Sequence, residues 1–337
     1  MRKIISPVGS LALAAVAGLV LVGCAPAAET GGGSGNDGNA SGGDAASERV
    51  EICYVTAAEA HPYVTPANEA FDAAAEDAGA TVTRLSQEFD VQTGTEQLNT
   101  CIGQNPDGIV LWPLDPQAYI PGLISAQDAG IPVVLINSPM DDEALEFVTS
   151  FTGPDVYDQG VMSADLINEL LGGEGQIVII AGQAGNGTTI GRTDGFTERL
   201  DELGSNIEVL QIVNADFDQQ KALEASRDLI TRFGDDLDAV YANDDTMARG
   251  FIDAWTESGR SLDDIPPITG INGQQDAFES IRDGSFYATI VQSPREDGKL
   301  ALNTIVAAAQ GEAVEARIPI PLTIVTSENV DDVEPAF

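Results

Sequence analysis

Cysteine and histidine are scarce in this 337-residue chain, which contains three cysteines and one histidine. A cluster of cysteine and histidine ligands around a metal ion is therefore hard to assemble, and a Ser-His-Asp triad would have to contain His61. Carboxylates are abundant, so acid and base chemistry on glycosides stays conceivable. We nevertheless expect no enzyme, no metal site and no cofactor.

Basic residues are also few, with 15 lysines and arginines against 54 aspartates and glutamates and a formal net charge of −39. A surface this acidic repels nucleic acid, so we expect no nucleic-acid partner. It also slows the approach of anionic solutes, which mildly favours a neutral or cationic ligand. The simpler alternative, which the composition favours more, is that the acidic surface keeps an exported protein soluble.

The N-terminus carries the pattern of an export signal. Arg2 and Lys3 precede an apolar stretch from Leu11 to Val22, which is shorter than the roughly 20 residues that a membrane-spanning helix needs. A small residue followed by Cys24 ends this stretch, as in a lipobox. We expect residues 1–23 to be a signal peptide and Cys24 to be the lipidated mature N-terminus, anchored to the outer face of the cytoplasmic membrane. A short, uncleaved anchor helix is the alternative.

The segment from Ala25 to Ser47 is almost entirely glycine, alanine, serine, asparagine and acidic residues. Such a segment has too little apolar surface to offset the entropy lost on ordering. We therefore expect residues 24–48 to be a flexible tether.

From Glu48 to Phe337 the chain alternates short apolar runs with longer amphipathic stretches. The predicted strands are Val50–Thr56, Thr81–Leu85, Gly108–Leu111, Val133–Ile136, Ile177–Ala181, Val209–Val213, Ala239–Tyr241, Ile268–Gly270 and Ala288–Val291. The predicted helices are Pro66–Ala78, Thr93–Gly103, Pro116–Ala129, Val156–Leu171, Arg192–Leu203, Gln219–Phe233, Thr246–Ser258, Gln275–Asp283 and Glu296–Gln310. This alternation predicts an α/β fold with parallel sheets wrapped by helices, and the number of strands favours two doubly wound lobes.

Ligands of such folds bind beyond the carboxyl ends of the strands, and polar or aromatic residues follow several of the predicted strands. They are His61, Tyr63, Trp112, Asn137, Asp244, Asn272 and Gln292. Amides and carboxylates can pair with hydroxyl groups, while aromatic rings can cover an apolar face of a ligand. For each polar residue alone a turn or a helix cap is the simpler interpretation, and Asp244 in particular is placed to cap the next helix.

A glycine-rich stretch follows one of the predicted strands. The stretch from Gly182 to Gly187 has the spacing G-x-x-G-x-G, not that of a dinucleotide-binding loop, so we expect its glycines to allow a tight turn at the mouth of a cleft.

Cys53 lies in an apolar strand and Cys101 in an amphipathic helix. A disulfide and two buried thiols are equally compatible with that pattern.

Several short motifs, in their order along the chain, resemble those of the type I periplasmic binding proteins, specifically the ribose-binding-like sugar group. They are His61-Pro62-Tyr63, Asp115 after Trp112-Pro113, Gly130-Ile131-Pro132-Val133 leading to Asn137, Gly195-Phe196, Ala215-Asp216-Phe217-Asp218, Asn243-Asp244-Asp245-Thr246-Met247-Ala248, Gly270-Ile271-Asn272-Gly273, Asp283-Gly284 and Ala288-Thr289-Ile290-Val291-Gln292. The resemblance covers Glu51 to Val325 and rests on the order of the motifs, because each motif alone is weak.

The resemblance implies two lobes joined by three crossings of the chain. Residues 49–153 with 293–320 would form lobe one, and residues 154–292 with 321–337 would form lobe two. The hinges would lie near Thr152-Gly153, Gln292-Ser293 and Ile320-Pro321.

The resemblance also implies a ligand site in the cleft between the lobes. Lobe one would supply His61, Tyr63, Trp112 and Asn137, and lobe two with the hinge would supply Phe217, Asp244, Asn272 and Gln292. Tyr63 and Phe217 would enclose a ring, and the polar side chains would bind its hydroxyls.

Two positions depart from the ribose-binding pattern, which has Asp-Arg after the fourth strand and an arginine after the glycine turn. Here we find Asn137-Ser138 and, near the second position, Ile190. Arg192 lies two residues further on and either reaches the cleft as a ligand contact or lies on the surface. The loss of both arginines would argue against ribose itself.

The implied function is capture of a small polar solute, most simply a sugar or polyol, by a monomer that delivers it to the permease of an ABC importer. Presentation of the ligand to a membrane sensor is one alternative, which the sequence does not separate from transport. Binding of a non-sugar solute is the other.

Overall fold

The computed structural model describes residues 49–337. The expected signal peptide, the lipidation site Cys24 and the tether lie outside the described residues. No helix within the described range is long and apolar enough to cross a membrane.

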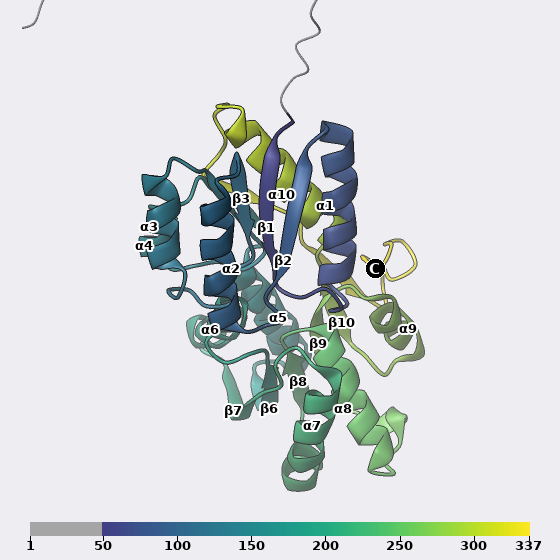
Figure 1. Ribbon diagram of the computed structural model, residues 1–337. Coiled ribbons are helices and arrows are strands. Elements are labelled where there is room, and N and C mark those ends of the chain that lie inside the picture. Colours follow the sequence, from purple (N-terminus) through teal and green to yellow (C-terminus); the bar gives the residue numbers. More distant parts are fainter. Residues whose placement is uncertain (1–48) are drawn as a thin grey trace, which may run out of the picture. The chain divides into compact units, whose positions relative to one another are not determined.

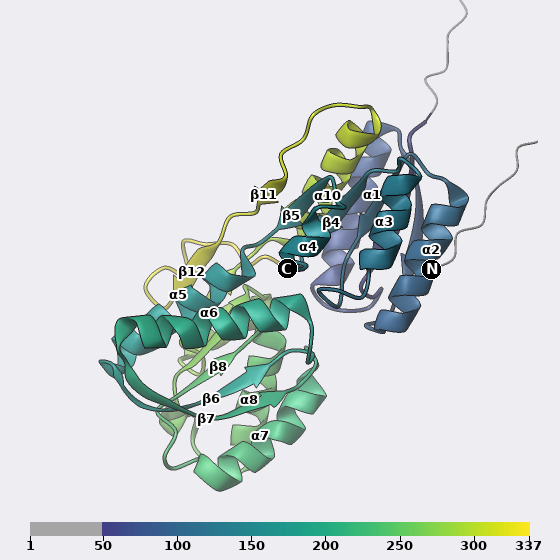
Figure 2. The ribbon, with the colours of Figure 1, turned by 90° about the vertical axis from the view of Figure 1, so that its left-hand side faces the viewer.

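The described chain forms two six-stranded sheets, which are seen from two directions in Figures 1 and 2. In the first sheet the order is β11 (Arg317–Pro319), β5 (Ser150–Gly153), β4 (Val133–Ile136), β3 (Gly108–Leu111), β1 (Glu51–Thr56) and β2 (Thr81–Ser86). In the second it is β12 (Thr323–Thr326), β10 (Ala288–Val291), β9 (Ile268–Asn272), β8 (Ala239–Ala242), β6 (Glu174–Ala181) and β7 (Asn206–Asn214). Neighbouring strands are parallel except for β10 and β12.

We call the part built on the first sheet lobe one and the part built on the second sheet lobe two. The helices of lobe one are α1 (Val64–Ala78), α2 (Val91–Gln104), α3 (Ile120–Asp128), α4 (Asp142–Leu145) and α10 (Pro294–Ala309). Those of lobe two are α5 (Val156–Leu171), α6 (Gly187–Leu203), α7 (Gln219–Phe233), α8 (Asp245–Glu257), η1 (Leu262–Asp264) and α9 (Gln275–Asp283). Helices cover both faces of each sheet, with α1 beside α10 and α7 beside α8 (Figure 1). The predicted α/β fold with two doubly wound lobes is confirmed.

The chain passes between the two sheets three times: after β5, after β10, and between β11 and β12. Strands β5, β11 and β12 were not predicted from the sequence. Each has only three or four residues and lies next to a crossing, so its place depends on which sheet the chain joins.

The two faces of each sheet are buried in alternation, as the period-two geometry of a strand requires. In β1, Ile52 and Tyr54 face the cluster that contains residues of α1 and α10, whereas Cys53 and Val55 face the cluster on the side of α2 and α3. Both faces of the strand are therefore apolar, as expected for a parallel sheet covered on both sides.

This alternation places Cys53 against α2, where it forms a disulfide with Cys101. The Cα atoms are 5.6 Å apart, within the range that a disulfide spans without distortion of the backbone. Of the two alternatives left open by the sequence, the structure has the disulfide.

Candidate functional site

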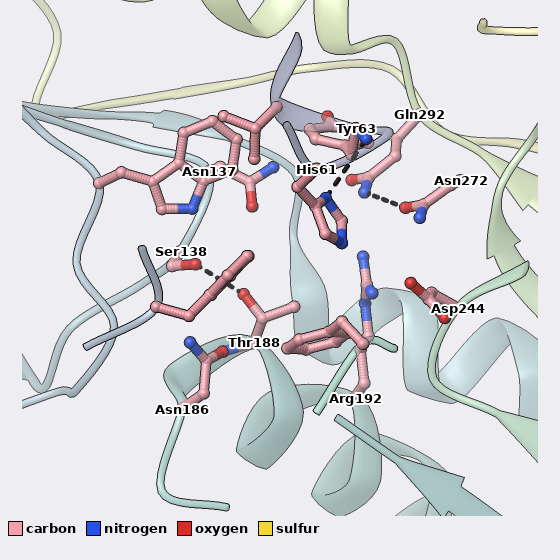
Figure 3. Close-up of a pocket in the computed structure, with 14 residues that line it drawn as sticks. His61, Tyr63, Asn137, Ser138, Asn186, Thr188, Arg192, Asp244, Asn272 and Gln292 are labelled. Atoms are coloured by element: carbon pink, nitrogen blue, oxygen red, sulfur yellow. Dashed lines mark hydrogen bonds between the residues drawn. The ribbon is translucent and has the colours of Figure 1, made fainter. Parts of the chain in front are cut away.

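A pocket of about 410 Å³ lies between the lobes, beyond the carboxyl ends of the strands (Figure 3). Lobe one contributes His61, Tyr63, Val64, Phe89, Trp112, Asn137 and Ser138, and lobe two contributes Asn186, Thr188, Arg192, Phe217, Asp244, Asn272 and Gln292. All nine residues expected to contact a ligand therefore line one pocket. Five further lining residues, Val64, Phe89, Ser138, Asn186 and Thr188, were missed.

His61 offers a hydrogen-bond donor to the pocket. Its Nδ1 accepts a 3.3 Å hydrogen bond from the backbone N–H of Tyr63, so the proton of the neutral ring is on Nε2. Nε2 is buried near the backbone of Phe217 and has no hydrogen-bond partner within residues 49–337. Burial lowers the pKa of His61 to about 4, so the ring is neutral at physiological pH.

Phe89 and Phe217 come from equivalent loops of the two lobes. Phe89 follows β2 and Phe217 follows β7, the second strand of each sheet along the chain. Both phenylalanines have positive φ, as does the residue before each of them, and each is followed by an aspartate that caps the next helix. Gly182 makes room for the Phe217 ring, because a Cβ at this position would clash with it. The repeated Phe-Asp pair is the sequence signal that identifies Phe89.

Tyr63 is held by two aromatic neighbours. Its ring packs edge to face against Trp112, with centroids 6.1 Å apart, and against Phe337. The expectation that Tyr63 and Phe217 enclose a ligand ring stays a prediction.

Arg192 is the buried cation of the pocket. It lies on α6, is 2% exposed and donates from Nε to Gln159 Oε1 at 2.8 Å and from Nη1 to the carbonyl oxygen of Asn243 at 2.6 Å. Ile190 is 42% exposed and does not line the pocket. Of the two alternatives left open for Arg192, the structure therefore has the one in which its guanidinium reaches the cleft.

Asp244 both caps a helix and lines the pocket, the two roles that the sequence suggested for it. Its Oδ1 accepts a 2.8 Å hydrogen bond from the backbone N–H of Met247 and so caps α8, while the side chain also lines the pocket on the same side as Arg192 (Figure 3). Burial raises the pKa of Asp244 to about 6, although the cap and the charge of Arg192 act in the opposite direction. The carboxyl is therefore largely ionised at neutral pH.

A chain of buried amides connects Arg192 to Asn272, and it includes Gln159, which the sequence analysis missed. Arg192 can only donate, so Gln159 turns its Oε1 toward it. Gln159 Nε2 then donates to Gln292 Oε1 at 2.9 Å, and Gln292 Nε2 donates to Asn272 Oδ1 at 2.7 Å. Asn272 is left with its Nδ2 as the donor for the pocket.

Side chains also connect the two lobes around the pocket. Asn186 Nδ2 donates to the carbonyl oxygen of Leu114 at 3.2 Å, and the hydroxyls of Ser138 and Thr188 are 2.9 Å apart. Gly187 is the first residue of α6, and a Cβ at this position would clash with the carbonyl oxygen of Pro139. The glycine-rich stretch thus lets the lobes approach closely.

The pocket is built for hydrogen bonding and stacking. Within the described part of the chain, no group of three or more histidine, cysteine, aspartate or glutamate side chains is placed to hold a metal ion. The pocket instead carries amide, hydroxyl, guanidinium and carboxylate groups beside aromatic rings, a set suited to a small polar ligand.

Comparison with known proteins places the chain in a family. Residues 52–313 match the family model described as "Periplasmic binding protein domain". The chain is 27% identical over 329 residues to the xylitol-binding protein of Mycolicibacterium smegmatis, covering 98% of this chain and 88% of that protein. It is 28% identical over 268 residues to the ribose import binding protein RbsB of Bacillus subtilis, covering 80% of this chain and 84% of that protein.

A similar solved structure is that of an ABC transporter solute-binding protein from Bacillus halodurans with bound myo-inositol. It has a TM-score of 0.78 and 28% identity, and the match covers 84% of this chain and 96% of that one. The family match and the shared two-lobed fold agree with each other. The chain therefore belongs to the periplasmic binding protein family with the type I fold, and it is a solute-binding protein, not an enzyme.

Proposed function

We propose that this protein captures an uncharged, polyhydroxylated solute, a sugar or a polyol, and delivers it to an ABC importer. The observation that carries the proposal is the pocket itself, in which donors and acceptors from both lobes surround a small volume beside aromatic rings. Hydroxyl groups both donate and accept, so they can satisfy such a mixed set. The names and titles of the relatives, which mention xylitol, ribose and myo-inositol, point to the same class.

The charges in the pocket favour an uncharged ligand. Arg192 and Asp244 are both buried and of opposite sign, so they compensate each other without a charged ligand. Neutral His61 adds no charge. An anionic ligand would leave Asp244 uncompensated, and burial of an unpaired charge is costly.

We further propose hinge closure as the mechanism of capture. The lobes would be residues 49–153 with 293–320 and residues 154–292 with 321–337, and the hinges would lie near Thr152-Gly153, Gln292-Ser293 and Ile320-Pro321. A ligand that contacts both lobes binds the closed form more tightly than the open form and so shifts the population toward closure.

Outside the cell, Cys24 would carry the lipid that holds the protein at the outer face of the cytoplasmic membrane, where the monomer meets its permease. Replacement of Cys24 by serine then releases the protein from the membrane fraction into the medium. Retention of the Cys24→Ser protein in the membrane fraction would contradict the lipid anchor.

The ligand class is tested by a thermal-shift screen of residues 48–337, which form one unit. Sugars, polyols, nucleosides and amino acids are compared at equal concentration. A ligand at 100 times its dissociation constant adds about 2.7 kcal/mol to the free energy of unfolding, which raises the melting temperature visibly. A shift with an amino acid or a nucleoside, and none with any sugar or polyol, would show that the proposal is wrong.

A further inference from the structure

We propose that Asp297 is a positioning residue of this pocket, whose buried carboxylate orients the Asn137 amide so that its oxygen accepts a hydrogen bond from a ligand hydroxyl. This inference rests on the proposed function, since it assigns a role toward a hydroxylated ligand. Asp297 does not line the pocket, and the sequence gives no sign of its role.

Asp297 lies directly behind the lobe-one wall of the pocket. It is in the first turn of α10, is 0% exposed, and accepts hydrogen bonds on Oδ2 from Asn137 Nδ2 at 2.8 Å and from the Tyr63 hydroxyl at 3.3 Å. The helix N-terminus favours a negative charge at this place. Asp297 thus contacts two pocket residues that lie far from it in sequence.

The chemistry of the pair decides the orientation of the amide. An ionised carboxylate can only accept hydrogen bonds, so above the pKa of Asp297, which burial raises to about 7, Asn137 must direct its Nδ2 toward this carboxylate. The Oδ1 of Asn137 is then turned into the pocket, as Figure 3 shows. An asparagine without such a partner can present either end to a ligand.

The backbone leaves Asn137 little other freedom. Asn137 has a φ of 66°, its N–H donates to Thr152 at 2.8 Å, and a Cβ on Gly153 would lie 2.8 Å from its Cα. The backbone at Asn137 is therefore held in place by Thr152 and Gly153, and the direction of the amide is the feature that Asp297 decides.

In lobe two the buried charge is positive, and the amide at the end of the chain of hydrogen bonds offers a donor. The buried cation Arg192 orients Gln159, Gln292 and Asn272 in turn, so that Asn272 offers a donor. A ligand between the lobes thus meets an acceptor at Asn137 and a donor at Asn272. A buried charge in each lobe specifies this polarity.

The test exchanges the two members of the pair. Asp297→Asn removes the fixed orientation, and Asn137→Asp places two carboxylates in contact, so each single change should weaken binding about 10-fold or more. The double variant Asn137→Asp, Asp297→Asn restores an amide that donates to a carboxylate and keeps an acceptor facing the ligand. Its affinity should return to within about threefold of the original.

Affinities are measured by calorimetry with xylitol, ribose and myo-inositol as probes, and folding is checked by the melting temperature. Glu296→Gln is the matched control, because it removes the same charge from the same helical turn at an exposed position, and it should leave affinity unchanged. If Asp297→Asn does not fold, comparison of Asn137→Asp with the double variant decides the question.

The proposal is overturned if Asp297→Asn binds as tightly as the original protein, or if the double variant binds no better than the weaker single variant. A purely structural role for Asp297 gives the second result, because exchange of the pair would not restore a lost fold element. Absence of binding by the unaltered protein to every sugar and polyol counts against the proposed function instead, so the two failures are distinct.

Discussion

Asn186 Nδ2 donates a 3.2 Å hydrogen bond across the cleft to the carbonyl oxygen of Leu114, while Oδ1 of the same side chain accepts from the backbone N–H of Thr188 and caps α6. One asparagine thus joins the start of a lobe-two helix to lobe one. Because the helix that it caps carries Thr188 and Arg192, contact between the lobes is coupled to the position of two pocket residues.

The two roles of Asn186 can be separated. Asn186→Ser keeps a cap acceptor and loses the bond across the cleft, so we expect nearly unchanged stability and an affinity lower by about 3- to 10-fold. Asn186→Ala loses both and should also lower the free energy of unfolding by about 1 kcal/mol. Calorimetry and urea unfolding measure the two effects. Full affinity in the serine variant would show that the cross-cleft bond does not support binding.

Asp244 allows a similar separation. Asp244→Ser preserves an oxygen for the Met247 N–H but removes the carboxylate, so affinity should fall by roughly 10- to 100-fold, as expected for a lost charge-assisted hydrogen bond. Asp244→Ala should lose affinity to the same degree and be less stable than the serine variant by about 1 kcal/mol. Equal stability of the two variants would mean that the cap contributes nothing, and retained affinity would remove Asp244 from the site.

The buried acids predict how stability depends on pH. Burial raises the pKa of Asp297 to about 7 from an ordinary value of 3.8, so between these values the folded protein binds more protons than the unfolded chain. The free energy of unfolding should therefore rise as pH falls from 8 to 5.5. Asp244 and Asp245, whose pKa values burial also raises, act in the same direction, while His61 acts in the opposite direction.

The contribution of Asp297 is isolated by comparison of two variants. Asp297→Asn should show a smaller gain in the free energy of unfolding between pH 8 and pH 5.5 than the unaltered protein, because the titrating group is gone. Glu296→Gln, which removes an exposed carboxylate of the same helical turn, should show the same gain as the unaltered protein. Urea unfolding at the two pH values measures these gains. An identical gain in all three proteins would contradict the assignment to Asp297.

The disulfide between Cys53 and Cys101 closes a loop with a sequence separation of 48 residues. Replacement of both cysteines by alanine should lower the free energy of unfolding by about 4 kcal/mol, since an open loop gives the unfolded chain more entropy. Thiol titration of denatured protein from residue 48 onward should find no free thiol. Two free thiols would show that the bridge does not form.

Much of the fold follows from local pattern. Helices α5, α7 and α9 have the bounds that the sequence predicts. Amphipathic periodicity defines each helix, a glycine follows the last residue of all three, and an aspartate caps the start of α5 and α7. Helix α3 begins at Ile120 and not at Pro116, because the Asp115 side chain accepts from the N–H groups of Gln117 and Ala118 and forms a turn first. Helix α6 begins at Gly187, five residues before the predicted start, because Asn186 caps a glycine and threonine turn that propensity disfavours.

The sequence by itself determined the two-lobed α/β class and the residues at the strand ends, since both depend on periodicity and position along a few neighbouring residues. Only the tertiary structure decided that Arg192 lies in the pocket while Ile190 is exposed, that Cys53 joins Cys101, and which end of the Asn137 amide is bound to Asp297. The reason is separation along the chain: Asn137 and Asp297 are 160 residues apart, and Gln159 and Gln292 are 133 apart. Contacts over such distances arise from the packing of whole lobes, and no local pattern encodes them.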